Sequence, residues 1–303
     1  MATSLPTYRA RRDIVRYGWG YVYVLPWVVL YLMFGLYPLV LSFYLSFFTF
    51  SFTQPDQLEF VGFGNWIRAA ADPLFWKSIL NIFYNQSVFI VLKNGAGLAT
   101  ALLLFQITWG VRFFRTIYFL PTLISVVVLM NIGGFMVSPN GPVQALLIQM
   151  GLLEGPFNWS YSTVWPMPVL ALINTWKWFG ISTIIFLAGL HSIDRQLYEA
   201  ASLDGATAWQ RFARITWPLL NPQILFILVI DVINGLQMFT EVFLIYDIKG
   251  GPAHQGLTPV LYLYGKAFGE NNIGYASSLG LLLAAIISLL TWVQFRVLRR
   301  DIS

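Results

Sequence analysis

The chain has 303 residues, of which 57% are hydrophobic and 10% are charged, with a formal net charge of +5 and a mean hydropathy of +0.67. A soluble globular protein carries roughly a quarter charged residues, so this composition excludes an ordinary soluble domain and indicates a chain solvated by a lipid bilayer. Cysteine is absent, which excludes disulfides and thiolate metal sites, and no basic stripe of the kind that binds nucleic acid is present.

Long apolar runs recur along the chain, and each can cross a hydrocarbon core of roughly 30 Å as a helix of about 20 residues. They do not alternate apolar and polar residues as the strands of a closed barrel would. The first run is longer than the roughly 7–15 apolar residues of a signal peptide, so we expect it to be retained. The predicted spans are 19–48, 78–105, 116–137, 166–189, 222–246 and 275–295. The sequence therefore predicts an all-α integral membrane domain with six transmembrane helices over 19–296, between tails at 1–18 and 297–303.

The basic residues outside the spans are distributed unequally, with 12 on one predicted side of the membrane and 4 on the other. The first set is Arg9, Arg11, Arg12, Arg16, Arg112, Arg115, Arg195, Arg211, Arg214, Arg296, Arg299 and Arg300, and the second is Arg68, Lys77, Lys249 and Lys266. Because lysine and arginine accumulate in cytoplasmic segments, both termini and segment 190–221 are predicted to be cytoplasmic. The segments 49–77, 138–165 and 247–274 then face outward, and 142–153 has the composition of a short interfacial helix.

The segment 190–221, between the fourth and fifth spans, is unusually polar for this chain. It divides at Asp204-Gly205, a turn dipeptide, with good helix formers before it and a second helical pattern after it. Trp209, Phe212 and Ile215 fall on one side of that second helix, and the small residues Ala200, Ala201 and Gly205 would allow another chain to approach closely. Pro218 and Pro222 suit the start of the fifth span. These features predict either a helix-turn-helix that binds another protein chain or a polar loop that only connects two spans.

The sequence "EAASLDGATAWQRFARITWP" at 199–218 resembles the cytoplasmic coupling loop of permease subunits in bacterial ABC importers, in the form similar to the carbohydrate-type, maltose-like subfamily. "FVGFGNW" (60–66), "RFFRTIYFLPTLIS" (112–125) and "GGP" (250–252) agree, so the resemblance covers nearly the whole chain. Trp217 stands where leucine is common in the family. The residues that match the coupling loop are Glu199, Ala200, Ala201, Asp204, Gly205, Ile215 and Pro218.

The resemblance implies a permease of the bacterial cytoplasmic (inner) membrane that forms half of a translocation pathway and works by alternating access. Its implied partners are a second, usually different, permease subunit, two ATPase subunits, an extracytoplasmic solute-binding protein, and a sugar or small glycoside. The coupling helix would dock on the ATPase. The chain has no GxxxxGK[ST] phosphate-binding loop, so no cofactor is expected on this chain, and ATP and Mg²⁺ belong to the partner ATPase.

Ionisable and polar residues also occur inside the predicted spans, where they are costly and mark functional candidates. Asp231, Asn234, Gln237 and Glu241 would lie within an arc of about 120° if the fifth span were one continuous helix. In the fourth span Lys177 lies between two tryptophans, and aromatic faces beside amide and charged groups suit a sugar. By position, the resemblance implies substrate contacts at Trp178, Ile181, Gln237 and Thr240.

Other interpretations remain open at this stage. Asp231 and Glu241 could only neutralise Lys177 or Lys93, and the tryptophans could form an interfacial belt. The solute could be glycerol-3-phosphate rather than a sugar. An ion-coupled secondary carrier would use Asp231, Glu241 and Lys177 as coupling groups, although it would not explain 199–218. A membrane enzyme lacks a catalytic set, and His191 and His254 are predicted on opposite sides of the membrane, so no metal pair is expected.

Overall fold

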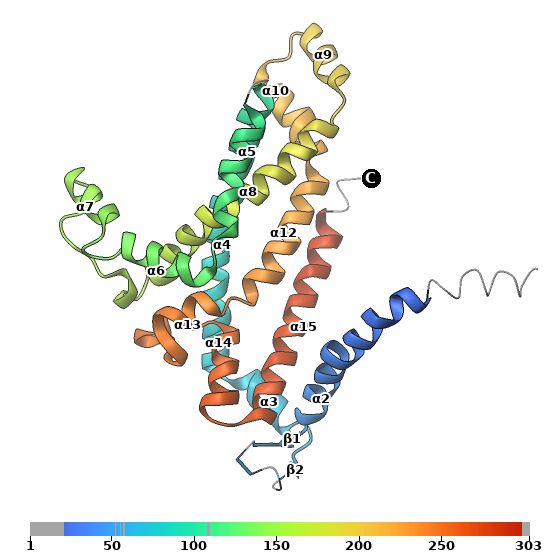
Figure 1. The fold of residues 1–303 in the computed structure, drawn as a ribbon, viewed down its shortest axis with the longest axis vertical. Helices are drawn as coiled ribbons and strands as arrows, with labels where there is room; N and C mark the ends of the chain where they lie inside the picture. The colour runs from blue at the N-terminus through green and yellow to red at the C-terminus, as the bar shows by residue number, and fades with distance from the viewer. Residues whose placement is uncertain (1–20, 52, 55, 57, 108–109, 299–303) are drawn as a thin grey trace, which may run out of the picture.

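The computed structural model describes residues 21–51, 53–54, 56, 58–107 and 110–298, and this part of the chain is almost entirely helical (Figure 1). The longest helices are α4 (Pro73–Gln106), α8 (Pro166–Ser192), α12 (Asn221–Leu236) and α15 (Ile273–Leu298). The predicted tail at 1–18 lies outside the described residues, as do Arg9, Arg11, Arg12, Arg16, Arg299 and Arg300. Of the tail predicted at 297–303, residues 297–298 still belong to α15, and 299–303 lie outside the described residues.

The shorter elements connect these helices. They are η1 (Leu32–Leu36), α2 (Tyr37–Leu45), β1 (Phe48–Thr49), β2 (Glu59–Phe60), α3 (Gly64–Ala71), α5 (Val111–Phe119), η2 (Leu120–Leu123), α6 (Val126–Met136), α7 (Pro142–Gln149), η3 (Trp159–Tyr161), α9 (Arg195–Leu203), α10 (Ala208–Arg211), η4 (Phe212–Thr216), α11 (Trp217–Leu219), α13 (Thr240–Tyr246), η5 (Asp247–Lys249), η6 (Pro252–His254), α14 (Pro259–Tyr264) and η7 (Gly265–Gly269). Strands β1 and β2 pair antiparallel. The predicted short helix within 142–153 is confirmed as α7.

Five helical segments in the described residues are long and apolar enough to cross a membrane, and a bent pair supplies a sixth if it counts as one span. The span predicted at 116–137 is not a straight helix, because Val111–Leu123 and Val126–Met136 meet at 97°. Pro121 has no N–H to continue an α-helix, and Ile124 and Ser125 adopt extended backbone conformations. The Ser125 hydroxyl then accepts a hydrogen bond from the Val128 N–H and starts α6 afresh.

The centre of the bundle is the long contact between α4 and α8. The two helices approach closely at Gly97, where an added Cβ would lie 2.5 Å from the Cβ of Ser182. Small residues at such contacts are the usual means of bringing membrane helices together, because apolar burial gives little driving force within lipid. α12 packs against this pair, and α15 packs against α12 on its other side, as Figure 1 shows.

The first span stands apart from the bundle. Residues 21–45 form a helix with no buried side chain in its apolar window, and it meets α15 through α2. Figure 1 shows this blue helix diverging from the remaining spans. The predicted range 19–48 is therefore longer than the described helix, since the chain turns after Leu45 and enters β1.

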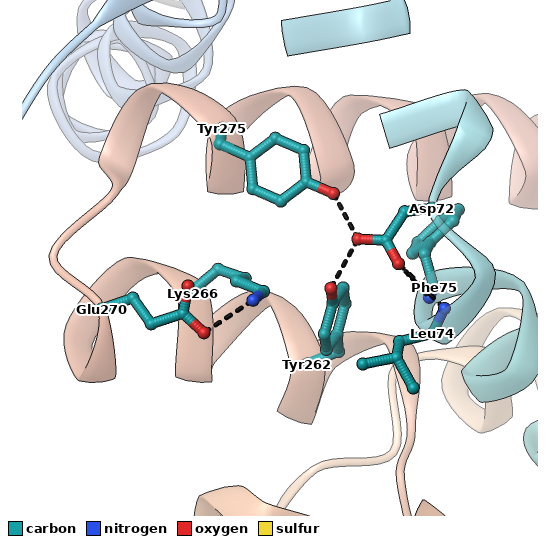
Figure 2. A network of polar contacts seen from close by, with 7 residues as sticks. All are labelled: Asp72, Leu74, Phe75, Tyr262, Lys266, Glu270 and Tyr275. Carbon is teal, nitrogen blue, oxygen red and sulfur yellow. Dashed lines mark hydrogen bonds and ion pairs between the residues drawn. The ribbon is translucent and has the colours of Figure 1, made fainter. Parts of the chain in front are cut away.

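A polar clamp, consisting of Asp72, Tyr262 and Tyr275, fastens the bundle at the end opposite α9 (Figures 1 and 2). Asp72 Oδ1 caps α4 by accepting hydrogen bonds from the N–H groups of Leu74 (2.8 Å) and Phe75 (3.3 Å). Its Oδ2 accepts from the hydroxyls of Tyr262 and Tyr275, each at 2.5 Å. Burial alone would raise the pKa of Asp72, but these hydrogen bonds outweigh it and hold the pKa below its usual value.

Candidate functional site

A cavity of about 490 Å³ lies where α4, α8, α12 and α13 meet. Of the eight residues predicted to line a substrate pathway, seven line this cavity: Trp178, Ile181, Asp231, Asn234, Gln237, Thr240 and Glu241. They come from α8, from α12, from α13 and from the break between α12 and α13. The fold therefore brings residues of the fourth and fifth spans to one cavity. Lys177 is not among the lining residues.

The helix break between α12 and α13 changes how the fifth-span residues reach the cavity. The span predicted at 222–246 is confirmed as the candidate span Asn221–Lys249, but its helix is not continuous, because α12 ends at Leu236 and α13 begins at Thr240. The 120° arc therefore cannot be extended across the break to Glu241. Exposed backbone inside a membrane needs partners, and the Thr258 hydroxyl supplies one by donating to the Met238 carbonyl at 2.8 Å.

A buried ion pair forms one wall of the cavity. The Lys93 ammonium donates to Asp231 Oδ1, and both residues are at most 5% exposed. Asn94 donates to Asp231 Oδ2 at 3.0 Å, and Ser182 donates to Asn94 Oδ1 at 2.8 Å. This chain of bonds joins α4, α8 and α12, and it confirms the interpretation in which Asp231 neutralises Lys93.

Lys177 has a different partner from the one that its sequence context suggests. Its ammonium donates to the carbonyl of Ile124, at the bend between η2 and α6, and lies 5.1 Å from the centre of the Trp178 ring. No ion pair within 4.0 Å joins it to Glu241 among the described residues, although the two attract each other through space. Lys177 therefore supports an interrupted helix whose carbonyl has lost its normal partner.

Sequence reasoning missed three polar residues of the cavity wall. Asn85 and Gln86 lie midway along α4, and Asn174 lies on α8. All three are buried. The sequence did contain a signal for them, namely side-chain amides within otherwise apolar spans. Polar groups buried in a membrane need a hydrogen-bond partner or have a functional role.

The cytoplasmic segment predicted at 190–221 forms the expected helix-turn-helix. Asp194 caps α9 by accepting from the Gln196 N–H, and Thr207 and Gln210 form a reciprocal capping box at α10. Gly205 lies between the two helices with φ +76°, a conformation that glycine adopts without strain. Figure 1 shows α9 and α10 at one tip of the molecule, far from β1 and β2.

Some of the predicted coupling residues are exposed at this tip, and others are partly buried where the tip meets the helix bundle. Glu199, Ala200, Asp204, Gly205 and Pro218 are exposed, whereas Ala201 and Ile215 are partly buried. Ile215 packs with Tyr198 against the apolar cluster of α4 and α8. An added Cβ at Gly205 would meet no other atom of the described chain within 4 Å, so the close neighbour anticipated for Gly205 is not within this chain.

Large apolar side chains are exposed on the same tip. Leu203 is 90% exposed and Trp209 is 71% exposed, and the Trp209 ring stacks on Phe212 with 5.5 Å between ring centres. Arg211 donates to the Ser202 hydroxyl at 2.8 Å and holds the two helices together. The result is a preformed surface with apolar projections.

Comparison with known proteins assigns the chain to a family. The family model described as "Binding-protein-dependent transport system inner membrane component" matches residues 93–302. The chain belongs to this family. The match includes the whole 199–218 segment, all of α12, and α4 from Lys93 onward.

Relatives cover nearly the full length of this family member. The lactose transport system permease protein LacF of Rhizobium radiobacter is 34% identical, over 92% of this chain and 94% of its own. The arabinooligosaccharides transport system permease protein AraP of Bacillus subtilis is 31% identical, over 91% and 87%. A bacterial alginate importer solved in complex with an alginate pentasaccharide-bound periplasmic protein matches with a TM-score of 0.80 and 25% identity, over 95% of this chain and 96% of that one. The chain is thus a multi-pass inner membrane permease of the ABC importer class.

The acidic and histidine side chains are distributed across the part of the chain that the structure describes. Within the described ranges, no group of three or more His, Cys, Asp or Glu residues is placed to hold a metal ion. His191 Nδ1 lies 2.7 Å from the Leu187 carbonyl oxygen of its own helix, and His254 Nδ1 lies 3.2 Å from the Lys249 carbonyl oxygen. The side chains that line the cavity offer a ligand hydrogen-bonding groups, aromatic faces and charge.

Proposed function

We propose that this chain forms one half of the translocation pathway of an ATP-driven sugar importer. The observation that carries the proposal is a polar, tryptophan-containing cavity inside a bundle that also presents the 199–218 segment at one tip. The relatives named for lactose and arabinooligosaccharides support a sugar as the solute. Amide, hydroxyl and carboxylate groups beside an aromatic ring suit a sugar, which has hydroxyl groups and apolar C–H faces.

The proposed partners follow from the two exposed surfaces. One ATPase subunit would receive α9 and α10 in a groove, and Leu203 and Trp209 would provide the apolar contact. Two ATPase subunits, with their ATP and Mg²⁺, would serve this chain and a second, different permease subunit. An extracytoplasmic binding protein would deliver the solute at the end that contains the Asp72 clamp, as the periplasmic protein in the alginate importer complex suggests.

The proposed coupling runs along a nearly continuous helical path. The elements α10, η4 and α11 lead directly into α12, which ends at the cavity. Leu220, fully buried at the start of α12, packs against α8 near Gly189. Movement of α9 and α10 with the ATPase would therefore displace α12, and with it Asp231 and Asn234, relative to α4.

Uptake into proteoliposomes tests this function. The permease pair, ATPases and binding protein should accumulate lactose, maltose, trehalose or arabinobiose only with ATP inside, and an ionophore should not abolish uptake. Uptake driven by an ion gradient without ATP would support a secondary carrier instead. Transport of glycerol-3-phosphate but of no sugar would reject the sugar assignment and retain the importer.

A further inference from the structure

The cavity has hydrogen-bond acceptors without partners. Asn174 Oδ1 and Gln86 Oε1 are buried and accept no hydrogen bond from the described residues, and both residues line the cavity. Each residue is more than nine-tenths buried, at 7% and 6% exposed. A buried acceptor without a donor is unfavourable, so a ligand that donates hydrogen bonds would be stabilised at this site.

Three of the side-chain amides that line the cavity donate hydrogen bonds to protein oxygens. Asn85 donates to the Met167 carbonyl at 2.8 Å, and Gln86 donates to Asn85 Oδ1 at 3.1 Å. Gln237 donates to the Ile233 carbonyl at 2.9 Å. Each of these three amide nitrogens therefore already has an acceptor within the protein.

The charged side chains at the cavity also favour a ligand that donates hydrogen bonds over an anionic ligand. Lys93 is neutralised by Asp231, and the Lys177 ammonium is held by the Ile124 carbonyl outside the lining. Glu241 lines the cavity and forms no ion pair within 4.0 Å among the described residues. A ligand would thus meet an unpaired carboxylate and no unpaired ammonium.

We propose that this cavity selects neutral, hydroxyl-rich sugars against sugars that carry a carboxylate, and that Glu241 is the discriminating residue. Sugar hydroxyls would donate to Glu241, Asn174 and Gln86, while the Trp178 ring offers a face for the sugar's C–H groups. An acidic sugar would place a second carboxylate near Glu241 in a medium of low dielectric constant, where like charges repel strongly. This inference rests on the proposed sugar-import function.

The test measures binding to the assembled permease–ATPase complex in nanodiscs without the binding protein, so that the binding protein's own selectivity does not contribute. The probe is the radiolabelled disaccharide, among lactose, maltose and trehalose, that the wild type imports best. Its competitors are the same sugar oxidised at the primary hydroxyls to carboxylates and the corresponding uronamide, which has the same shape without the charge. The uronamide should compete about tenfold or more better than the acid. Glu241→Gln should lower the ratio of uronamide affinity to acid affinity several-fold. Glu154→Gln, the same change at an exposed loop residue, should leave that ratio unchanged.

The outcomes separate the two proposals. If no disaccharide of the panel is imported with ATP, the proposed function fails. If a disaccharide is imported but the wild type binds the acid as well as the uronamide, the selectivity inference alone is overturned. It is equally overturned if Glu241→Gln binds the neutral probe but leaves the ratio unchanged, because the discrimination would then come from another residue. A wild-type ratio near one overturns the inference whether or not the variant assembles.

Discussion

The cavity and the exposed tip are both polar regions of a very apolar chain, but they are held together in opposite ways. At the cavity, Lys93 pairs with Asp231, which lies 138 positions further along the chain. At the tip, the Thr207–Gln210 capping box and the Arg211–Ser202 bond join residues at most nine positions apart. The difference shows that a charge inside the bundle requires a partner from another helix, because burial of an unpaired charge is costly, whereas exposed groups are solvated by water.

The largest effect should come from breaking the buried ion pair. Lys93→Met leaves the Asp231 carboxylate without its cation, which costs about 3–5 kcal/mol in comparable buried pairs. We expect a large loss of folded protein and of melting temperature in detergent. Lys93→Met combined with Asp231→Leu should recover much of the stability, because replacing both partners removes the uncompensated charge. If the single variant melts like the wild type, the pair does not hold α4 to α12.

The Asp72 clamp, at the opposite end from α9, also joins residues that are distant in sequence, because Tyr262 and Tyr275 lie 190 and 203 positions after Asp72. Since the pKa of Asp72 is lowered on folding, its ionised form stabilises the fold above the pKa of the unfolded state, about 3.9. That stability is lost as the pH falls through the lower folded-state pKa. Melting temperatures measured from pH 6 to pH 3 should therefore fall for the wild type.

Asp72→Asn should already be destabilised at pH 6, by about 1.5–3 kcal/mol for loss of hydrogen bonds to a charged group. Its melting temperature should vary less with pH over the acid range than that of the wild type. An equal acid-induced decrease in the two proteins would assign the pH dependence to other carboxylates.

The exposed tip should respond in function rather than in assembly. Gly205→Val introduces a side chain at φ +76°, where the backbone strain costs about 1–2 kcal/mol. Gly151→Val is a matched control, because Gly151 also has positive φ and open space around it. Both variants should insert normally, but only Gly205→Val should abolish stimulation of ATP hydrolysis by loaded binding protein. Glu199→Lys, on the same exposed face, should also reduce it. Wild-type stimulation in both Gly205→Val and Glu199→Lys would make 199–218 a passive connector.

The smallest effect should come from an exposed residue at the cavity. Gln237 lies at the end of α12 and donates to the Ile233 carbonyl of its own helix. Loss of one neutral hydrogen bond to solute is worth about 0.5–1.5 kcal/mol, so Gln237→Ala should alter sugar uptake by roughly two- to tenfold with normal membrane levels. Unchanged uptake kinetics for every sugar in the panel would remove Gln237 from the site.

The sequence by itself determined the features that depend on neighbouring residues. The hydropathy of each run predicted the long helices, since about 20 apolar residues suffice to cross a bilayer. The Asp204-Gly205 turn and the flanking helix formers predicted the tip, because caps and turns are formed by residues a few positions apart. The 199–218 pattern also indicated the family that the comparisons confirm.

Only the tertiary structure decided which distant groups meet. It bent the third span at Ile124 and Ser125 and gave the exposed carbonyl to Lys177, and it broke the fifth span before Thr240. It also paired Lys93 rather than Lys177 with Asp231 and left Glu241 facing the cavity. Helical periodicity could not predict these results, because it describes one helix at a time. A buried charge or carbonyl is satisfied by whichever group the packing of other helices brings within reach.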